Sequence, residues 1–167
     1  GAARVARELR GEPALQAAMM NVMGRVYHRL GLYDTAGELL REGLAMRRRL
    51  FPGDHAEVAE SLNDTGQLAR DAGRFDEADS LQRAALAMRQ RLFGAGHPEV
   101  AESLNDLALV AIEQGRYDEA EAMLRDAVAI RREGAMREAP QLATALFNLG
   151  FLLKERGRYE EVEPLYR

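Results

Sequence analysis

The sequence predicts an all-α protein, a right-handed superhelical α-solenoid of antiparallel helix pairs in about four repeats. Three observations support this fold class. Short motifs recur with a fixed 42-residue period, apolar residues within each repeat are spaced three and four apart, and no segment alternates between polar and apolar residues as a strand would. Stacked helix pairs of this kind bury their apolar faces on their neighbours along the array.

Two sets of motifs keep the same register and define the repeats. One begins with glycine and continues with an aromatic residue and an acid, starting at Gly31, Gly73, Gly115 and Gly157. The other begins with an apolar residue, at Met20-Asn21, Leu62-Asn63, Leu104-Asn105 and Leu146-Phe147. We therefore expect one solenoid over residues 1–167, with units at about 13–54, 55–96, 97–138 and a truncated 139–167. Residues 1–12 align with the tail of a preceding second helix, so we expect a fragment of a longer array.

Each unit is expected to contain two helices, and the third unit illustrates why. Its first helix is predicted from about Pro98 to Gln114, and Gly115 is expected to end it in the left-handed conformation. The second helix is predicted to follow Tyr117, with Asp118 capping its amino end and Glu121 completing a capping box. The same interpretation assigns caps in the other units to Asp34, Asp76 and Glu160.

The order of residues in each unit resembles the tetratricopeptide repeat. A small residue late in the first helix, such as Ala108, is followed by Gly-Arg-Tyr-Asp-Glu-Ala at 115–120 and by an apolar face in the second helix. The usual period of that family is about 34 residues. The additional length, with the sequence from His97 to Asn105, resembles the 42-residue variant of kinesin light chains and of many bacterial multidomain proteins. The resemblance covers nearly the whole chain and implies a protein-binding scaffold, although the family serves many unrelated systems.

Composition argues against several classes of protein. The chain has 167 residues, 47% of them hydrophobic and 30% charged, and no apolar stretch approaches the roughly 18 residues of a membrane-spanning helix. A net charge of −4 argues against nucleic-acid binding, which usually needs a basic face. The absence of cysteine excludes disulfides and suits a reducing cytosol, so we expect a cytoplasmic protein. No phosphate-binding loop, nucleophile elbow or metal-ligand spacing is present, so we expect no enzyme, cofactor or metal.

Positions that face the concave wall of such a solenoid differ between repeats and form the candidate binding site. The asparagines at 21, 63 and 105 are equivalent and resemble those that hold an extended peptide backbone in this family, because a carboxamide both donates and accepts hydrogen bonds. With their helical neighbours, the candidate peptide-binding groove comprises Asn21, Arg25, His28, Asn63, Gln67, Arg70, Asn105, Leu109, Ile112, Phe147, Phe151 and Lys154, with Arg29 beside them. Its first half is basic and its second half apolar, which predicts a protein or peptide partner with acidic residues at one end and a bulky hydrophobic side chain at the other.

Simpler interpretations stand beside these. The asparagines could bond only a neighbouring repeat or water. The arginine runs at 47–49 and 131–132 end second helices and are expected on solvated faces, where they favour the helix dipole. His55 and His97 lie at loop-to-helix junctions and are expected to pack or to cap. The aromatic residues at 33, 75, 117 and 159 are expected to pack between repeats.

Three classes of function follow from this pattern. A peptide-binding adaptor is expected to lose affinity when Asn63 and Asn105 are replaced by alanine. The alternative is a module that self-associates through its truncated ends, or one that regulates an enzyme in its own chain. The resemblance to bacterial proteins with such repeats implies a Ser/Thr kinase, an NTPase or a CHAT-type protease as that enzyme. Catalysis by the array itself is the third class, and it is not expected because an active site is seldom copied in every repeat.

Overall fold

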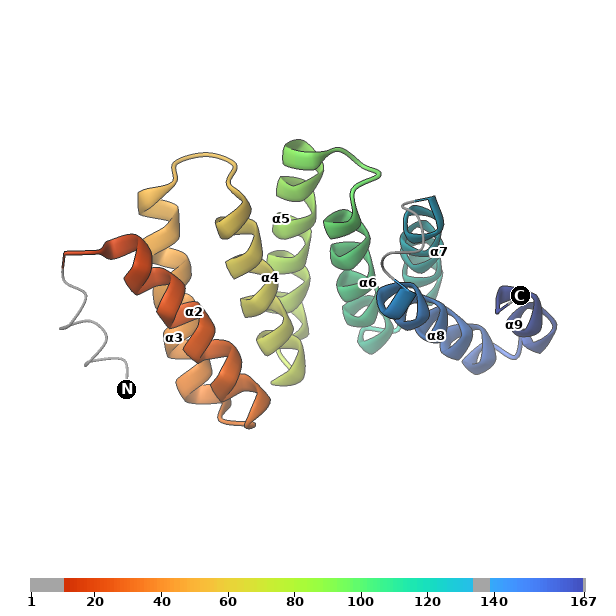
Figure 1. The fold of residues 1–167 in the computed structure, drawn as a ribbon. Helices are drawn as coiled ribbons and strands as arrows, with labels where there is room; N and C mark the ends of the chain where they lie inside the picture. Colours follow the sequence, from red (N-terminus) through yellow and green to blue (C-terminus); the bar gives the residue numbers. More distant parts are fainter. Residues whose placement is uncertain (1–10, 134–138, 167) are drawn as a thin grey trace. The chain divides into compact units, whose positions relative to one another are not determined.

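The computed structural model describes residues 11–133 and 139–166, and within them it contains α-helices and no β-strand (Figure 1). The all-α fold class predicted from the sequence repeat is confirmed. The helices, in chain order, are α2 (Pro13–Arg29), α3 (Tyr33–Leu50), α4 (Ala56–Asp71), α5 (Phe75–Phe93), α6 (Pro98–Glu113), α7 (Tyr117–Glu133), α8 (Ala139–Glu155) and α9 (Tyr159–Leu165).

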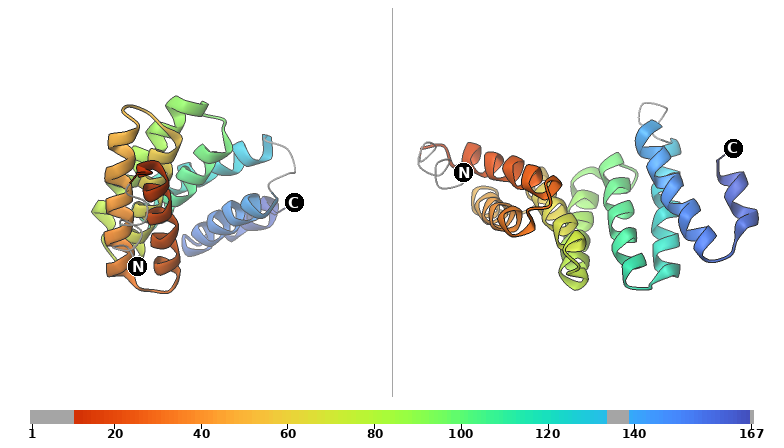
Figure 2. Two further views of the ribbon diagram at one scale, coloured as in Figure 1. Left: turned by 60° about the vertical axis from the view of Figure 1, so that its left-hand side comes forward. Right: turned by 90° about the horizontal axis from the view of Figure 1, so that it is seen from below.

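The chain divides into two compact units, residues 1–88 and 89–167, with the division inside α5. In the first unit, α2 and α3 form an antiparallel pair and α4 packs on both of them (Figure 1). In the second unit, α6 pairs with α7 and α8 with α9, and α8 also contacts α6 and α7 (Figure 2). Our expectation of one continuous solenoid over residues 1–167 stays a prediction.

The turn within each helix pair depends on a glycine in the left-handed region. The glycines at 31, 73, 115 and 157 have φ angles of 73–74°, as the repeat pattern predicted. Residues with a Cβ atom rarely adopt this conformation. At Gly115, the following Arg116 amide donates to the Ala111 carbonyl at 2.8 Å, which satisfies a carbonyl at the end of α6. The chain therefore reverses within a few residues, and α7 begins directly afterwards.

The predicted acidic caps of the second helices are wrong, because the N-cap residues of α3 and α9 are Leu32 and Arg158, two residues before the predicted caps. These helices begin at the aromatic residue, so Asp34 is the second residue of α3 and Asp118 the second of α7. No side chain caps α3 or α9. These helices therefore begin two residues earlier than the capping pattern implies, directly after the glycine turn. The acids of the first turn still favour the helix dipole, and an arginine before the aromatic residue pairs with an acid three residues on, as Arg74 does with Glu77 at 2.6 Å.

Histidine caps begin α4 and α6. The Glu57 amide donates to His55 Nδ1, and the Glu99 amide donates to His97 Nδ1, each at 3.3 Å. Each imidazole also stacks on an aromatic ring four residues earlier, with His97 4.6 Å from the centre of Phe93. The expectation that these histidines pack or cap is confirmed, since they do both.

We expect replacement of His97 by alanine to lower the free energy of unfolding by about 1 kcal/mol, because the Glu99 amide loses its acceptor. His97→Asn keeps an acceptor at the cap and removes only the ring stack, so it should retain most of the stability. Urea denaturation followed by circular dichroism measures both variants. Equal losses in the two variants would show that the stack, and not the cap, stabilises this junction.

Small residues bring the paired helices close together. Ala36, Ala78 and Ala120, at one repeat position of the second helices, are completely buried. At Gly24 of α2, an added Cβ would lie 2.6 Å from the Leu40 side chain of α3, which is closer than van der Waals contact allows. The close packing predicted from the small residues is confirmed at these positions.

The arginines that end the second helices are not all solvated, and the prediction is wrong for Arg47. Arg47 is 4% exposed and donates to Ser61 Oγ at 2.8 Å and to the Glu57 carbonyl at 2.9 Å. The same contact recurs one repeat later, where Arg89 donates to Ser103 Oγ at 2.8 Å. The end of each of these second helices lies against the next first helix, so the side chain turns inward toward buried acceptors. We call the pairs Arg47–Ser61 and Arg89–Ser103 the arginine–serine contacts.

The third copy of this contact is altered. Arg131 holds the arginine position, but the serine position is occupied by Ala145, which has no side-chain acceptor. Arg131 is half-buried, and burial lowers its pKa although the Glu102 carboxylate opposes that shift. Its neighbour Arg132 is exposed, as predicted for this run.

Candidate functional site

The predicted asparagine row lies mostly inside the protein. Asn21 is 1% exposed, and its Nδ2 donates to Asp64 Oδ2 at 2.6 Å while its Oδ1 accepts from Ser61 Oγ at 3.2 Å. Asn63 is 2% exposed. Asn105 is half-buried and accepts at 2.8 Å from Asn148 Nδ2. Asn21 and Asn105 therefore bond the following first helix, as the simpler interpretation anticipated, and their role toward a ligand stays a prediction.

Four other predicted residues line one hollow in the first unit. Arg25, His28 and Arg29 of α2 and Gln67 of α4 enclose it with Tyr33 and Asp71, and its volume is about 400 Å³. Helical spacing on α2 and the repeat register on α4 place these side chains on neighbouring faces. The predicted polar half of the groove therefore corresponds to a concave surface in this unit.

Acidic residues that the sequence analysis overlooked neutralise much of this polar surface. Arg25 lies 2.7 Å from Glu60 and 3.2 Å from Asp64. His28 Nε2 lies 2.8 Å from Asp71, and Arg70 also pairs with Asp71, at 2.9 Å. These carboxylates all belong to α4. The repeat offset between α2 and α4 could have revealed Asp64 and Asp71, since they follow Arg25 and His28 by 39 and 43 residues, close to one repeat length. Glu60 follows Arg25 by only 35 residues.

The pKa values of Arg25 and Asp64 are both raised, but by different causes. Burial alone lowers the pKa of Arg25, but the hydrogen bond to Glu60 and the charge of Asp64 outweigh it and raise the pKa above its usual value. Burial raises the pKa of Asp64, against the opposing effects of Arg25 and Asn21. The arginine therefore stays charged and held between two carboxylates.

The remaining predicted residues lie in the second unit, and three of them line an apolar hollow. Phe147, Phe151 and Lys154 of α8 line a cavity of about 540 Å³ between α8 and α9. Phe147 is 63% exposed and Phe151 48% exposed, which is unusual for large aromatic side chains. Leu109 and Ile112 are half-buried on α6. The wall opposite Phe147 and Phe151 consists of residues that the groove prediction lacked: Tyr159, Val162 and Glu163 of α9, and Tyr166 directly after it.

A third hollow, of about 400 Å³, lies in the second unit where the altered third contact occurs. Glu102 and Asn105 of α6, Arg131 of α7 and Thr144 and Ala145 of α8 are among its lining residues. Burial raises the pKa of Glu102, against the opposing charges of Arg89 and Arg131. Comparison of the repeats could have located this hollow, because alanine replaces the serine of the two earlier copies.

Over residues 11–133 and 139–166, histidine, aspartate and glutamate side chains form no group of three that could hold a metal ion. In the same part of the chain, no helix has the length and apolar character needed to cross a membrane.

Comparison with known proteins agrees with the repeat architecture. A family model described as tetratricopeptide repeat matches residues 15–90 and 66–133. Comparison with curated protein sequences gives no significant match.

Among solved structures, BtubC (BKLC) from P. vanneervenii is similar with a TM-score of 0.84 and 24% identity, over 92% of this chain and 61% of that chain. A putative kinesin light chain from Podosopora anserina, with nearly identical TPR-like repeats, has a TM-score of 0.82 and 22% identity, over 92% and 72% of the two chains. A Rap protein complexed with competence and sporulation factor has a TM-score of 0.81 and 18% identity, over 92% and 41%. The chain thus spans less than two thirds of BtubC and of the Rap protein, and at these identities the similarity concerns the fold.

Proposed function

Because the chain belongs to the tetratricopeptide repeat family, we propose that it is a non-catalytic protein-interaction scaffold that binds an extended peptide segment. The fold by itself does not identify the ligand. The proposal therefore depends on the side chains that the first helix of each pair exposes. The Rap protein of similar fold, which is complexed with competence and sporulation factor, supports a binding role.

The apolar hollow between α8 and α9 carries the proposal. Phe147 and Phe151 expose large ring surfaces on the face that the repeat register assigned to ligand binding. Covering such surface with a partner contributes roughly 25 cal/mol per Å² of apolar area removed from water. A bulky hydrophobic side chain of the peptide fits this hollow, and Lys154 at its edge offers a charge to a neighbouring acidic residue of the peptide.

The polar hollow of the first unit, taken by itself, suits an acidic ligand less well than the apolar hollow suits a hydrophobic one. An acidic ligand side chain there would compete with Asp71 for His28 and with Glu60 and Asp64 for Arg25. We therefore expect the hydrophobic residue of the peptide to contribute more to binding specificity than its acidic residues. Gln67, which lines the same hollow, is suited to hydrogen bonds with a peptide backbone.

The test is a phage-displayed library of random peptides selected on the chain, followed by titration of labelled synthetic peptides from that selection. We expect Phe151→Ser to weaken binding about tenfold, since the ring is part of the apolar wall. Leu32→Ser is the matched control, because Leu32 is similarly exposed at 50% but lies in the turn before α3. Unchanged affinity in Phe151→Ser, or an equal loss in the control, would contradict binding at this hollow. Asn63→Ala is a poorer test, since Asn63 is buried and its replacement disturbs packing.

A further inference from the structure

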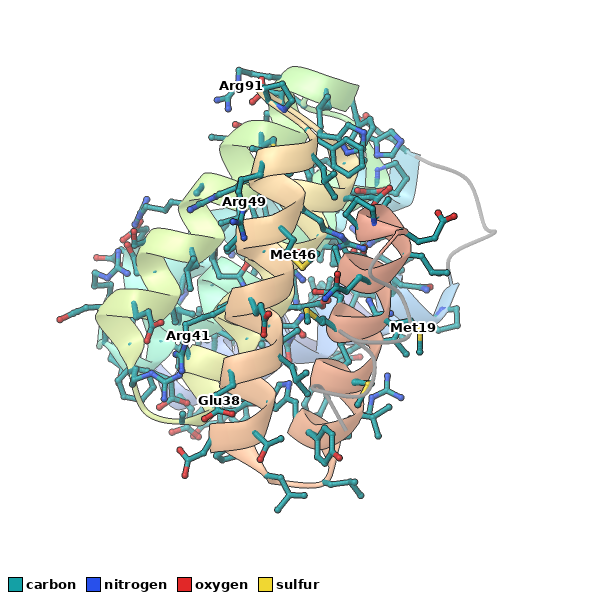
Figure 3. All side chains as sticks on the ribbon, turned by 90° about the vertical axis from the view of Figure 1, so that its left-hand side faces the viewer. Met19, Glu38, Arg41, Met46, Arg49 and Arg91 are labelled. Atoms are coloured by element: carbon teal, nitrogen blue, oxygen red, sulfur yellow. The ribbon has the colours of Figure 1, made fainter. Side chains whose placement is uncertain are left out.

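Arg131 holds a repeat position at which arginine binds acceptors of the following helix. In the first unit, Arg47 lies 3.0 Å from the Glu60 carboxylate and donates to the Ser61 hydroxyl at 2.8 Å. This inward orientation is specific to the position, because Arg49 of the same run is exposed and lies on the outer side of α3 (Figure 3). The position that Arg131 holds is therefore one at which a guanidinium group meets a carboxylate and a hydroxyl.

The acceptors that meet this arginine are replaced in the third copy. Arg89, in the second copy, lies 3.3 Å from Glu99 and 3.7 Å from Glu102 and makes the arginine–serine contact. At the three equivalent positions, α8 has an amide, a hydroxyl and a methyl side chain: Gln141, Thr144 and Ala145. The first turn of α8 also contains no acidic residue, whereas those of α4 and α6 contain Glu57 and Glu99. Helix α8 therefore brings no carboxylate to these positions.

The hollow of about 400 Å³ described above lies at this altered contact. The Thr144 hydroxyl donates to the Pro140 carbonyl at 3.0 Å, so this side chain is engaged within its own helix. Arg131 is half-buried, and a hydrogen bond between a partly desolvated guanidinium and a carboxylate is stronger than one at an open surface. The carboxamides of Gln141 and Asn105 line the same hollow and offer neutral donors. An anionic group of a ligand thus meets one charged and two neutral donors here.

The acidic residues of α6 that also line the hollow are compatible with an anion. Glu99 and Glu102 both lie near Arg89, and Glu102 also attracts Arg131. Asp106 is 8% exposed and has interactions of its own. The second repeat has acids at the same three positions of its first helix, and its Arg89 still binds two glutamates of the next helix. Acids at these positions therefore coexist with further carboxylates beside the arginine.

We propose that this hollow binds the carboxylate side chain of an aspartate or glutamate of the peptide, through Arg131. The ligand carboxylate takes the place that a glutamate of the following helix occupies in the two earlier copies. The assignment rests on the proposed peptide-binding function, and it places a site for the acidic residue on the helix that also carries the apolar hollow. The two segments of α8 that border the hollows, 141–145 and 147–154, are centred about 11 Å apart along the helix axis. An extended peptide spans that distance in about four residues.

A pair of peptides tests the role of Arg131. One is a peptide selected on the full 167-residue chain that carries an acid, and the other is the same peptide with glutamine in place of that acid. Fluorescence titration should give about fivefold weaker binding for the glutamine peptide, and Arg131→Gln should abolish that difference. Arg49→Gln removes an exposed arginine at the end of a second helix in the other unit and should preserve it. A difference that persists in Arg131→Gln would overturn the proposal, even where binding still depends on Phe151.

A substitution on α8 restores the carboxylate of the earlier copies. Thr144→Glu places an acid where Glu60 and Glu102 stand in their repeats, so it should pair with Arg131 and weaken the acidic peptide about fivefold. Thr144→Gln is the matched control, because it has the same size without the charge and should keep the preference for the acidic peptide. Thr144 is exposed, so neither change disturbs the core. Equal affinities of the two variants for the acidic peptide would contradict binding at this hollow.

A small probe separates this site from the proposed function. N-acetylglutamate N-methylamide carries the carboxylate without a hydrophobic residue. Titrated into the isotopically labelled chain, it should shift the backbone amide resonances of Thr144 and Ala145 with a roughly millimolar dissociation constant, and its glutamine analogue should not. No shift with either probe would reject the carboxylate site and leave the apolar hollow and its peptide unaffected. Shifts in a chain that binds no library peptide would support this site and reject the proposed function.

Discussion

Replacing Arg47 by alanine should lower the free energy of unfolding by about 3 kcal/mol and the Tm by roughly 6–12 °C. The side chain is 4% exposed, and its loss leaves the Ser61 hydroxyl, which is completely buried, without its donor. The Glu57 carbonyl loses a partner as well. Glu60 contributes less to the loss, because it is 42% exposed and water can solvate it again. Thermal and urea denaturation of the two proteins measure the change.

Arg131→Ala is the matched control for this substitution. It removes the same side chain from the same repeat position, but the residue opposite is Ala145 and Arg131 is only half-buried. We expect a loss of about 1 kcal/mol or less. If the two alanine variants lose equal stability, the arginine–serine contact is not the source of the effect, and the stem of the arginine side chain would account for both.

Glu121→Gln should lower the free energy of unfolding by about 2 kcal/mol at neutral pH. The carboxylate is 12% exposed and accepts from Arg125 at 3.0 Å, Arg156 at 2.7 Å and Arg158 at 2.5 Å. Glutamine keeps the volume but removes the charge that holds three guanidinium groups. The contact joins α7 to the end of α8 and the start of α9, so the substitution should loosen that corner of the second unit.

The same substitution has a defined pH dependence. Burial raises the pKa of Glu121, but hydrogen bonds from Arg125 and Arg158 outweigh burial and lower it below its usual value of 4.5. A lowered pKa in the folded state means that the ionised carboxylate stabilises the fold above about pH 4.5, and that this stability disappears as the pH falls through the lower value. The difference between wild type and Glu121→Gln should therefore be constant near neutrality and shrink in acid. The exposed Glu113, changed to glutamine, should show no comparable difference. A gap that stays constant into strong acid would refute this account.

Features copied from repeat to repeat could be predicted from the sequence. These features are the left-handed glycines, the buried small residues and the histidines at the helix starts. Because each recurs in the register of the repeat, its role in one repeat predicts its role in the others. The prediction of acidic caps was wrong, although the acidic residues also recur in every repeat. Asp118 stands at a suitable distance from Gly115 in sequence, but Tyr117 already has a helical conformation and leaves the acid inside the first turn.

Contacts between repeats were much harder to predict from the sequence. Arg47 meets Ser61, and Asn21 meets Asp64, across different helices whose faces are set by packing. For the candidate site, helical spacing correctly grouped Phe147 with Phe151 around one hollow. It overestimated the positive charge in the first unit, because the neutralising acids lie on α4.

The two ends of α8 are held very differently. Near its carboxyl end, Arg156 is bound to Glu121 of α7 at 2.7 Å, and halfway along the helix Asn148 donates to Asn105 at 2.8 Å. At its amino end, Thr144 and Ala145 border the hollow of about 400 Å³ beside Arg131. The polar contacts that join α8 to its neighbours here thus lie at its middle and just after its end, whereas the hollow borders its first half. Any rotation of α8 about those contacts would change the width of the hollow at Ala145.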